Sequence, residues 1–223
     1  MKLNKNLNRT VKITICHISP LLLSKIMYYH KYKKKLNLKN PILFNEKLMY
    51  LKIKNYNNNN IVWQCSDKYL VREYAKKHGV EEKNLPKLIY VYNTPDEINF
   101  DTLPNKFALK CTHGCGFNII CTDKEKLNKK ETLEKLKKWQ KTKFGYESAE
   151  VHYTHVKPLI ICEEYLNFKD ELPNDYKVYC FNGVPKVILV CSERDKGLKL
   201  NFYDLEWNEL LIGENKYRNK NEI

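Results

Sequence analysis

Residues 106–123 read KFALKCTHGCGFNIICTD, and this stretch predicts two strands joined by a glycine loop. Side chains alternate between the two faces of a strand, so Phe107 and Leu109 share one face while Lys110 lies on the other. Gly114 and Gly116 lack a Cβ, which lets a loop take positive φ and direct its N–H groups at an anion. A lysine beside such a loop is typical of a site that holds phosphate groups.

The spacing of this loop is that of neither common nucleotide-binding fingerprint. Gly114-Cys115-Gly116 is followed by a strand pattern, whereas the Walker A loop and the Rossmann turn both lead into a helix. The alternative is a plain glycine hairpin with a lysine that faces solvent, and residues 106–123 alone leave that alternative open.

Two further strand regions carry charged residues that matter for the site. The apolar run at 159–166 contains the adjacent Glu163 and Glu164, whose side chains point to opposite faces of a strand, so that only one can serve a ligand on a given face. A hairpin over 176–191 turns at Asn182-Gly183, the strongest short hairpin signal, and carries Lys177 on its first strand.

Helices are expected before and between these strands. Ser19 precedes Pro20 as an N-cap should, the spacing over 44–54 is helical, and Ser66 is expected to cap a helix that runs to Lys77 and stops at Gly79. A charged stretch from Asp123 is expected to be helical with an interruption near Asn128.

The net charge of +14 suggests an anionic partner, but the residues that carry it argue against nucleic acid. Of 40 basic residues only Arg9, Arg72, Arg194 and Arg218 are arginine, the residue that base readout favours. Residues 1–45 hold ten lysines and arginines and no acid, so an anionic membrane surface or an acidic polymer is a candidate partner there. The alternative is a helix that packs on its own domain with a solvated lysine face.

The chain has eight cysteines, none of them in Cys-x-x-Cys spacing. They predict reduced core thiols and a cytoplasmic protein, at most peripheral to the inner face of a membrane, because no apolar stretch is long enough to span one. A zinc site is a weaker alternative, because structural zinc sites usually pair their ligands at gaps of about two to four residues. Its candidate ligands are Cys111, His113, Cys115 and Cys121.

Several short motifs occur in one order along the chain. They are Asn40-Pro41, Phe44-Asn45-Glu46-Lys47, Asp67-Lys68-Tyr69, Arg72-Glu73-Tyr74, Leu103-Pro104-Asn105-Lys106-Phe107, Lys110, His113, Gly114, Gly116, Glu163-Glu164-Tyr165-Leu166, Asp175-Tyr176-Lys177, Phe181-Asn182-Gly183, Arg194, Phe202-Tyr203-Asp204 and Trp207. With these motifs the sequence resembles the TupA-like ATP-grasp family, which is associated with teichuronopeptide and other cell-surface polysaccharide synthesis.

The resemblance implies an α+β, two-lobed fold with antiparallel sheets that grips ATP, preceded by a helical region. We expect a basic, mainly helical part at 1–85, a first lobe with the glycine loop at 86–161 and a second lobe at 162–223. Residues 213–223 look like a polar tail, so we expect the second lobe to be truncated and its metal-binding end to be missing.

The same resemblance implies the site residues. Lys110, Lys177 and Arg194 would be catalytic, with Lys110 and Lys177 on the phosphates of one ATP. The nucleotide would be held by Lys110, His113, Gly114, Gly116, Glu163, Glu164, Tyr165, Leu166, Asp175 and Lys177. Asp67, Lys68 and Arg72 are expected only to tie the N-terminal region to the lobe, and the metal ligands stay unknown.

The implied activity is that of an ATP-dependent carboxylate–amine ligase that uses ATP and Mg²⁺ on an acidic polysaccharide or another carboxylate substrate. Two alternatives stay open. One is a glycosyltransferase of the same pathway, in which the glycine loop would hold a nucleotide sugar. The other is a non-catalytic module that binds an anionic polymer or a membrane surface.

Overall fold

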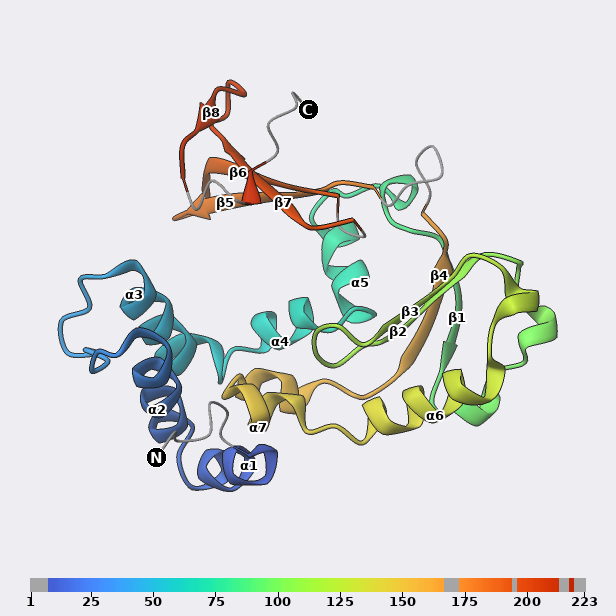
Figure 1. Cartoon of the computed structure of the whole chain (residues 1–223), viewed down its shortest axis with the longest axis horizontal. Coiled ribbons are helices and arrows are strands. Elements are labelled where there is room, and N and C mark those ends of the chain that lie inside the picture. The colour runs from blue at the N-terminus through green and yellow to red at the C-terminus, as the bar shows by residue number, and fades with distance from the viewer. Residues whose placement is uncertain (1–7, 167–172, 194–195, 213–216, 219–223) are drawn as a thin grey trace. The chain divides into compact units, whose positions relative to one another are not determined.

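The computed structural model describes residues 8–166, 173–193, 196–212 and 217–218. The chain divides into two compact units, Met1–Tyr165 and Leu166–Ile223. Each unit has a four-stranded antiparallel sheet, and the first unit also has all seven of the α-helices found among the described residues (Figure 1). The predicted α+β class is confirmed.

The sheet of the first unit has the strand order β1-β4-β2-β3. Its strands are β1 (Leu88–Tyr92), β2 (Phe107–Cys111), β3 (Asn118–Cys121) and β4 (Ile160–Glu164). Phe107 and Leu109 are fully buried while Lys110 is partly exposed, which confirms the predicted alternation. Because β4 lies between β1 and β2, the two glutamates at its end are next to the strand that carries Lys110.

Helix α6 (Lys129–Gln140) packs against this sheet and completes its core (Figure 1). The Asn128 side chain accepts a hydrogen bond from Glu131 N–H at 3.0 Å, so the helix begins where the interruption was expected. Leu136 is fully buried in the core cluster, with Trp139 packed beside it. Short 3₁₀ turns connect the elements of this region, namely η2 (Glu82–Asn84), η3 (Pro95–Glu97), η4 (Phe100–Thr102) and η5 (Lys124–Lys126).

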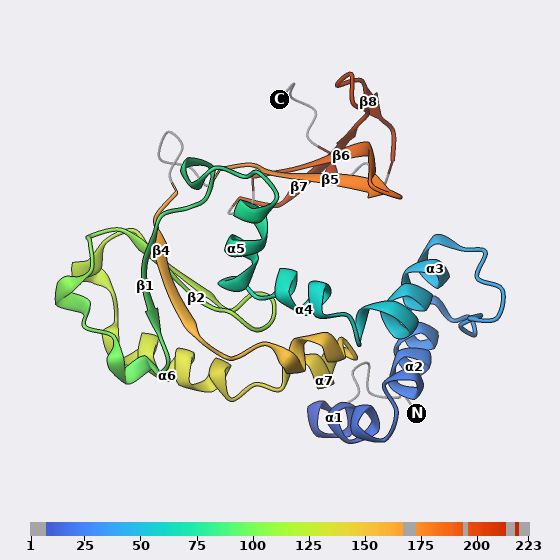
Figure 2. The same ribbon diagram turned by 180° about the vertical axis from the view of Figure 1, so that it is seen from behind.

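The basic N-terminal helices pack on their own unit. Helices α1 (Arg9–Ile18) and α2 (Pro20–Tyr32) lie against α7 (Phe144–Ser148) and η6 (Val151–His155), around buried Cys16, Leu23 and Ala149 (Figure 2). Ser19 Oγ accepts from Leu22 N–H at 3.1 Å, which confirms the predicted cap. Arg9 pairs with Glu147 at 2.5 Å, so α1 is fixed to residues far along the chain.

The next helices differ from the prediction at one point. The elements are α3 (Phe44–Leu51), the π-helical turn η1 (Lys52–Tyr56), α4 (Asn60–Ser66) and α5 (Leu70–Lys77). Ser66 ends α4 and bonds back to the Val62 carbonyl, so the expected cap at Ser66 is wrong. Asp67 replaces it, because its Oδ1 accepts from the N–H groups of Tyr69 and Leu70, where α5 begins.

The second unit is a meander whose strands pair in chain order. They are β5 (Asp175–Phe181), β6 (Val184–Ser192), β7 (Lys199–Tyr203) and β8 (Glu209–Leu210). Asn182 and Gly183 have φ values of 52° and 78°, as a two-residue type I′ turn requires, so the predicted hairpin is confirmed. Strand β8 was not predicted.

The compact units divide the chain after Tyr165, so that the whole of β4 belongs to the first unit. The expected boundaries at 85/86 and 161/162 stay predictions. In the part of the chain that the structure describes, we find no helix that combines the length and the apolar character needed to cross a bilayer.

Candidate functional site

Lys110 takes part in a three-residue charge cluster on the first sheet. The β2–β4 register places Ala108 opposite Glu163, so Lys110 and Glu163 lie on the same face, two residues apart diagonally. Lys110 Nζ is 2.6 Å from Glu163 Oε2, and Arg72 Nη1 is 3.2 Å from Glu163 Oε1. One carboxylate therefore joins two cations, one from β2 and one from α5.

The three members of the Lys110–Glu163–Arg72 cluster differ in their access to solvent. The side chains of Arg72 and Glu163 are each 7% exposed, whereas that of Lys110 is 28% exposed. These two cations and one carboxylate carry a formal charge of +1, and Arg72 Nη2 also lies 3.6 Å from Glu82 Oε1 at the surface. The ammonium of Lys110 is the accessible part of the cluster. An anion can therefore reach Lys110 while the carboxylate behind it keeps the lysine in position.

The segment just before α5 contacts the glycine loop between β2 and β3. Lys68 Nζ donates to the Gly114 carbonyl at 2.5 Å. Burial lowers the pKa of Lys68, and the charge of Lys110 lowers it further, so the two ammonium groups are close enough to interact. Thr112 Oγ1 donates to the Lys157 carbonyl at 2.6 Å and fixes the start of the loop to the segment before β4.

The two glycines of the loop have positive φ for different reasons. Gly114 has a φ of 111°, and a Cβ there would lie 2.8 Å from Phe144 Cγ, so it lets the loop pack tightly on α7. Gly116 has a φ of 75° and open space where a Cβ would lie. Gly114 is needed for packing, while Gly116 leaves the loop backbone accessible to a ligand.

Replacing Gly114 by alanine is expected to lower the free energy of unfolding by about 3 kcal/mol, because backbone strain and a steric clash add together. Gly116→Ala is the matched control and should cost only about 1 kcal/mol, since it introduces strain without a clash. Urea unfolding of the two variants tests the difference. Equal losses would show that Phe144 does not limit the space at Gly114.

His113 lies inside the protein beneath the loop. It is 5% exposed, and its Nε2 lies 3.1 Å from the Trp139 carbonyl, so this nitrogen carries the proton and donates. Its Nδ1 has no partner among the described residues. Burial lowers the pKa of His113 below its ordinary value of 6.5, so the ring is neutral near pH 7. Its expected contact with nucleotide stays a prediction.

The neutral His113 makes stability depend on pH. Below about pH 6.5 the unfolded chain binds more protons than the folded chain, so acid favours unfolding. We expect the free energy of unfolding to fall as the pH decreases from about 7.5 to 5.5, and His113→Gln to remove part of that fall. His152, whose pKa burial also lowers, should account for a remainder. Parallel profiles for the wild type and the variant would rule out His113 as a source.

The end of β4 separates the roles of the two glutamates. Glu163 pairs with Lys110 and Arg72 in the charge cluster. Glu164 is only partly buried, and its Oε1 accepts a hydrogen bond from Lys87 N–H at 2.6 Å. The Lys106 ammonium lies 5.8 Å from the centre of the Tyr165 ring. Leu166, the first residue of the second unit, is 49% exposed.

A family model described as TupA-like ATPgrasp matches residues 46–223 of the chain. The chain belongs to the TupA-like ATP-grasp family. The match confirms the resemblance inferred from the motifs, and it begins within α3, so that α1 and α2 lie outside it. Comparison with curated proteins and with solved structures found no match.

In the second unit of this TupA-like ATP-grasp protein, Lys177 lies on β5 beside Asp175. Lys177 Nζ is 3.1 Å from Asp175 Oδ2 and 3.3 Å from Cys191 Sγ. Partial burial opposes the charge, but these hydrogen bonds raise the pKa of Lys177 above its ordinary value. Its side chain is 52% exposed, so it is charged and accessible. Arg194, the third predicted catalytic residue, lies outside the described residues.

The candidate zinc ligands of this ATP-grasp protein have separate surroundings. Cys111 and Cys121 are buried in the core, where burial raises the pKa of Cys111 to about 11, while Cys115 Sγ lies 3.6 Å from the Tyr153 hydroxyl. Across the described ranges, no three or more histidine, cysteine, aspartate or glutamate side chains form a group suited to a metal ion.

Arg72 and Lys68 contact the site, although the sequence analysis predicted only that they connect the N-terminal region to the first lobe. Both precede the glycine loop by about forty residues, and their contacts with Glu163 and Gly114 depend on the docking of α5 on the sheet. The signal that could have found them was their place in the motifs Asp67-Lys68-Tyr69 and Arg72-Glu73-Tyr74.

Proposed function

We propose that this ATP-grasp protein is an ATP-dependent ligase that activates a carboxylate and joins it to an amine. The observation that carries the proposal is the accessible Lys110, fixed by the buried Glu163 beside an open glycine loop in a chain of this family. An accessible ammonium on the strand that leads into a glycine loop with an exposed Gly116 suits the phosphates of a nucleotide.

We assign the roles as follows. Lys110 and the loop around Gly116 bind phosphate oxygens, and Glu163 acts on the nucleotide only through Lys110, as a positioning residue. Glu164 and the backbone of Tyr165 serve the base and ribose, because Glu163 is already engaged by two cations. Lys177 binds phosphate and Asp175 orients it, and the 3.1 Å ion pair between the two supports the role of Asp175.

The proposed chemistry has two steps. A substrate carboxylate attacks the γ-phosphorus of ATP in line, and the bond from that phosphorus to the β–γ bridging oxygen breaks. The products of this step are ADP and an acyl phosphate. An amine then attacks the acyl carbon and phosphate leaves, which gives an amide and releases one proton. The lysines contribute by stabilising the charge on the phosphoryl oxygens, which is the main source of catalysis in phosphoryl transfer.

Mg²⁺ would accompany ATP and neutralise part of the phosphate charge. Among the described residues, no three or more histidine, cysteine, aspartate or glutamate side chains form a group that could hold a metal ion. We therefore assign no ligand and no step to the ion.

We further propose that the carboxylate belongs to a cell-surface polysaccharide or a teichuronopeptide precursor, and that the protein acts at the cytoplasmic side of the membrane. This finer assignment rests on the family motifs and on the basic residues at 1–45. Acidic polysaccharide fragments and amines should therefore stimulate the release of ADP.

Calorimetric titration of the full chain with ATP, ADP and UDP-sugars, with and without Mg²⁺, tests the proposal. We expect ATP and ADP to bind and UDP-sugars to bind at least about tenfold more weakly. A preference for UDP-sugars would favour a glycosyltransferase and overturn the ligase assignment. Binding of no nucleotide, with salt-sensitive binding of an anionic polymer, would overturn it in favour of a binding module.

A further inference from the structure

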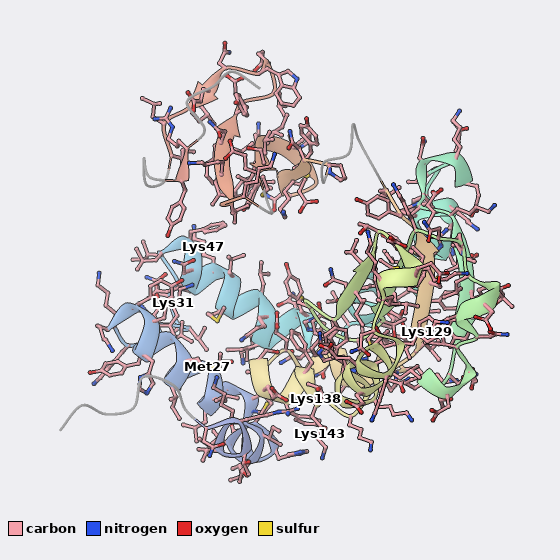
Figure 3. All side chains as sticks on the ribbon, turned by 45° about the vertical axis from the view of Figure 1, so that its right-hand side comes forward. Met27, Lys31, Lys47, Lys129, Lys138 and Lys143 are labelled. Atoms are coloured by element: carbon pink, nitrogen blue, oxygen red, sulfur yellow. The ribbon has the colours of Figure 1, made fainter. Side chains whose placement is uncertain are left out.

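A cavity lies in the helical part of the first unit, and no residue of the glycine loop lines it. It has a volume of about 540 Å³, within the range of small-molecule sites. Its walls come from α1, α2, α3, η1, Ser148 at the end of α7 and Glu150 just before η6. Met27 and Lys31, two of the lining residues, are labelled on α2 in Figure 3. None of the residues assigned above to nucleotide lines it.

The cavity contains a buried hydroxyl that lacks a partner. Ser24 lies on α2, is 1% exposed, and its Oγ has no hydrogen-bond partner among the described residues. Buried hydroxyls are normally hydrogen-bonded, because an unsatisfied one costs about 1–3 kcal/mol. A ligand that accepts from Ser24 Oγ would satisfy it.

The charges around the cavity favour an anion. Lys12, Lys31 and Lys52 line it, while Glu150 is the carboxylate among the lining residues. No described carboxylate forms an ion pair with Lys52, and burial lowers its pKa although Glu150 partly opposes this. Glu46, which lies near Tyr28, is occupied by the N–H groups of Ile42 and Leu43. The walls thus have a formal excess of two positive charges, before any contribution from His30.

Part of the remaining wall is apolar. Met27 and Tyr28 of α2 and Met49 of α3 line the space beside the lysines. Methionine side chains adapt to irregular apolar shapes, and tyrosine offers a flat apolar face. The cavity therefore combines lysine side chains with apolar ones.

We propose that this cavity binds a phosphate monoester whose organic part is apolar or aromatic, with the phosphate at Lys52 and Ser24 and the organic part against Met27, Tyr28 and Met49. A dianionic phosphate matches the excess of two positive charges, and its oxygens accept from both the ammonium and the hydroxyl. The phosphate can belong to a free metabolite or to a lipid headgroup, and the experiment distinguishes the two sources.

The test is calorimetry of the full chain with phenyl phosphate as the probe, and with phenol and inorganic phosphate as the two half-ligands. We expect phenyl phosphate to bind at least about tenfold more tightly than either half-ligand, because it contacts both the lysine and the apolar side chains of the cavity. Equal affinity for phenol and phenyl phosphate would overturn the proposal.

Variants locate the binding. Lys52→Met should weaken phenyl phosphate binding by about tenfold or more, and Ser24→Ala should weaken it severalfold. Lys54→Met is the matched control, because Lys54 is exposed in the same turn η1 and does not line the cavity. If Lys52→Met and Lys54→Met have the same effect, the proposal fails. Ser24→Ala removes an unsatisfied hydroxyl, so its thermal midpoint should not fall, which separates binding from folding.

Two further arms separate this cavity from the nucleotide site and identify the source of the phosphate. Lys52→Met should leave ATP affinity unchanged, so the cavity and the ligase proposal can fail independently. Vesicles of phosphatidic acid, but not of phosphatidylcholine, should compete with phenyl phosphate if a lipid headgroup is the source. If they do not compete while phenyl phosphate still binds, the source is a free phosphate ester.

Discussion

Lys110→Met is expected to weaken ATP binding by about ten- to a hundredfold. A hydrogen bond between an ammonium and a phosphate oxygen contributes about 1.5–3 kcal/mol, and Lys110 is the accessible cation of its cluster. The variant keeps the length and the apolar stem of the side chain, so Glu163 retains Arg72 as its partner. Calorimetric titration of the variant with ATP measures the loss.

Lys126→Met is the control for removal of a lysine from the same unit. Its side chain is 85% exposed and pairs with Asp123 at the surface, so we expect ATP affinity to change less than about twofold. If Lys110→Met and Lys126→Met bind ATP equally well, Lys110 does not contact the phosphates.

Arg72→Met is expected to lower the free energy of unfolding by about 3 kcal/mol or more. Removing one member of a buried ion pair leaves the other charge without compensation, and Glu163 and Arg72 are both 7% exposed. Lys110 continues to pair with Glu163, which places the loss at the lower end of the usual range. Because the pair joins α5 to β4, the loss should appear in the cooperative unfolding of the first unit under urea.

A second change tests the cause of this destabilisation. Adding Glu163→Gln to Arg72→Met removes the buried carboxylate that has lost its arginine partner and should restore about 1 kcal/mol or more. Lys83→Met, which breaks the exposed pair with Glu81, should cost less than about 0.5 kcal/mol. An Arg72→Met variant as stable as Lys83→Met would contradict a structural role for the buried pair.

Much of the fold could be predicted because the signals are local. The β2–β3 stretch has strand-forming residues on both sides of its glycine loop, the Asn182-Gly183 turn fixes its hairpin by its own backbone preferences, and Ser19 with Pro20 marks the start of α2. In each case the residues that decide the structure are neighbours in sequence.

The sequence was less informative at two places, the start of α5 and residues 144–157. Ser66 and Asp67 are both good caps, and the sequence does not show which one will face the N–H groups of α5. Residues 144–157 have no clear period because α7 and η6 are short and are stabilised by packing against α1 and α2.

The site could be predicted only in part because its contacts are distant in sequence. Lys110 and the glycine loop were found from their own pattern, but Arg72 meets Glu163 across 91 positions. The choice between Glu163 and Glu164 likewise depends on the pairing of β4 with β2, which fixes the face that each side chain occupies. Gly114 looked like a phosphate-loop glycine, but Phe144, thirty residues later, determines the space around it.

Lysine acetylation of the full chain, read by mass spectrometry with and without saturating ATP and Mg²⁺, tests the nucleotide assignment most directly. Lys110 and Lys177 are both accessible, so each should react in the free protein and be protected severalfold by ATP, while exposed Lys126 and Lys186 react at unchanged rates. If ATP slows the acetylation of Lys110 no more than that of Lys126, the phosphate-binding role of Lys110 and its glycine loop is wrong.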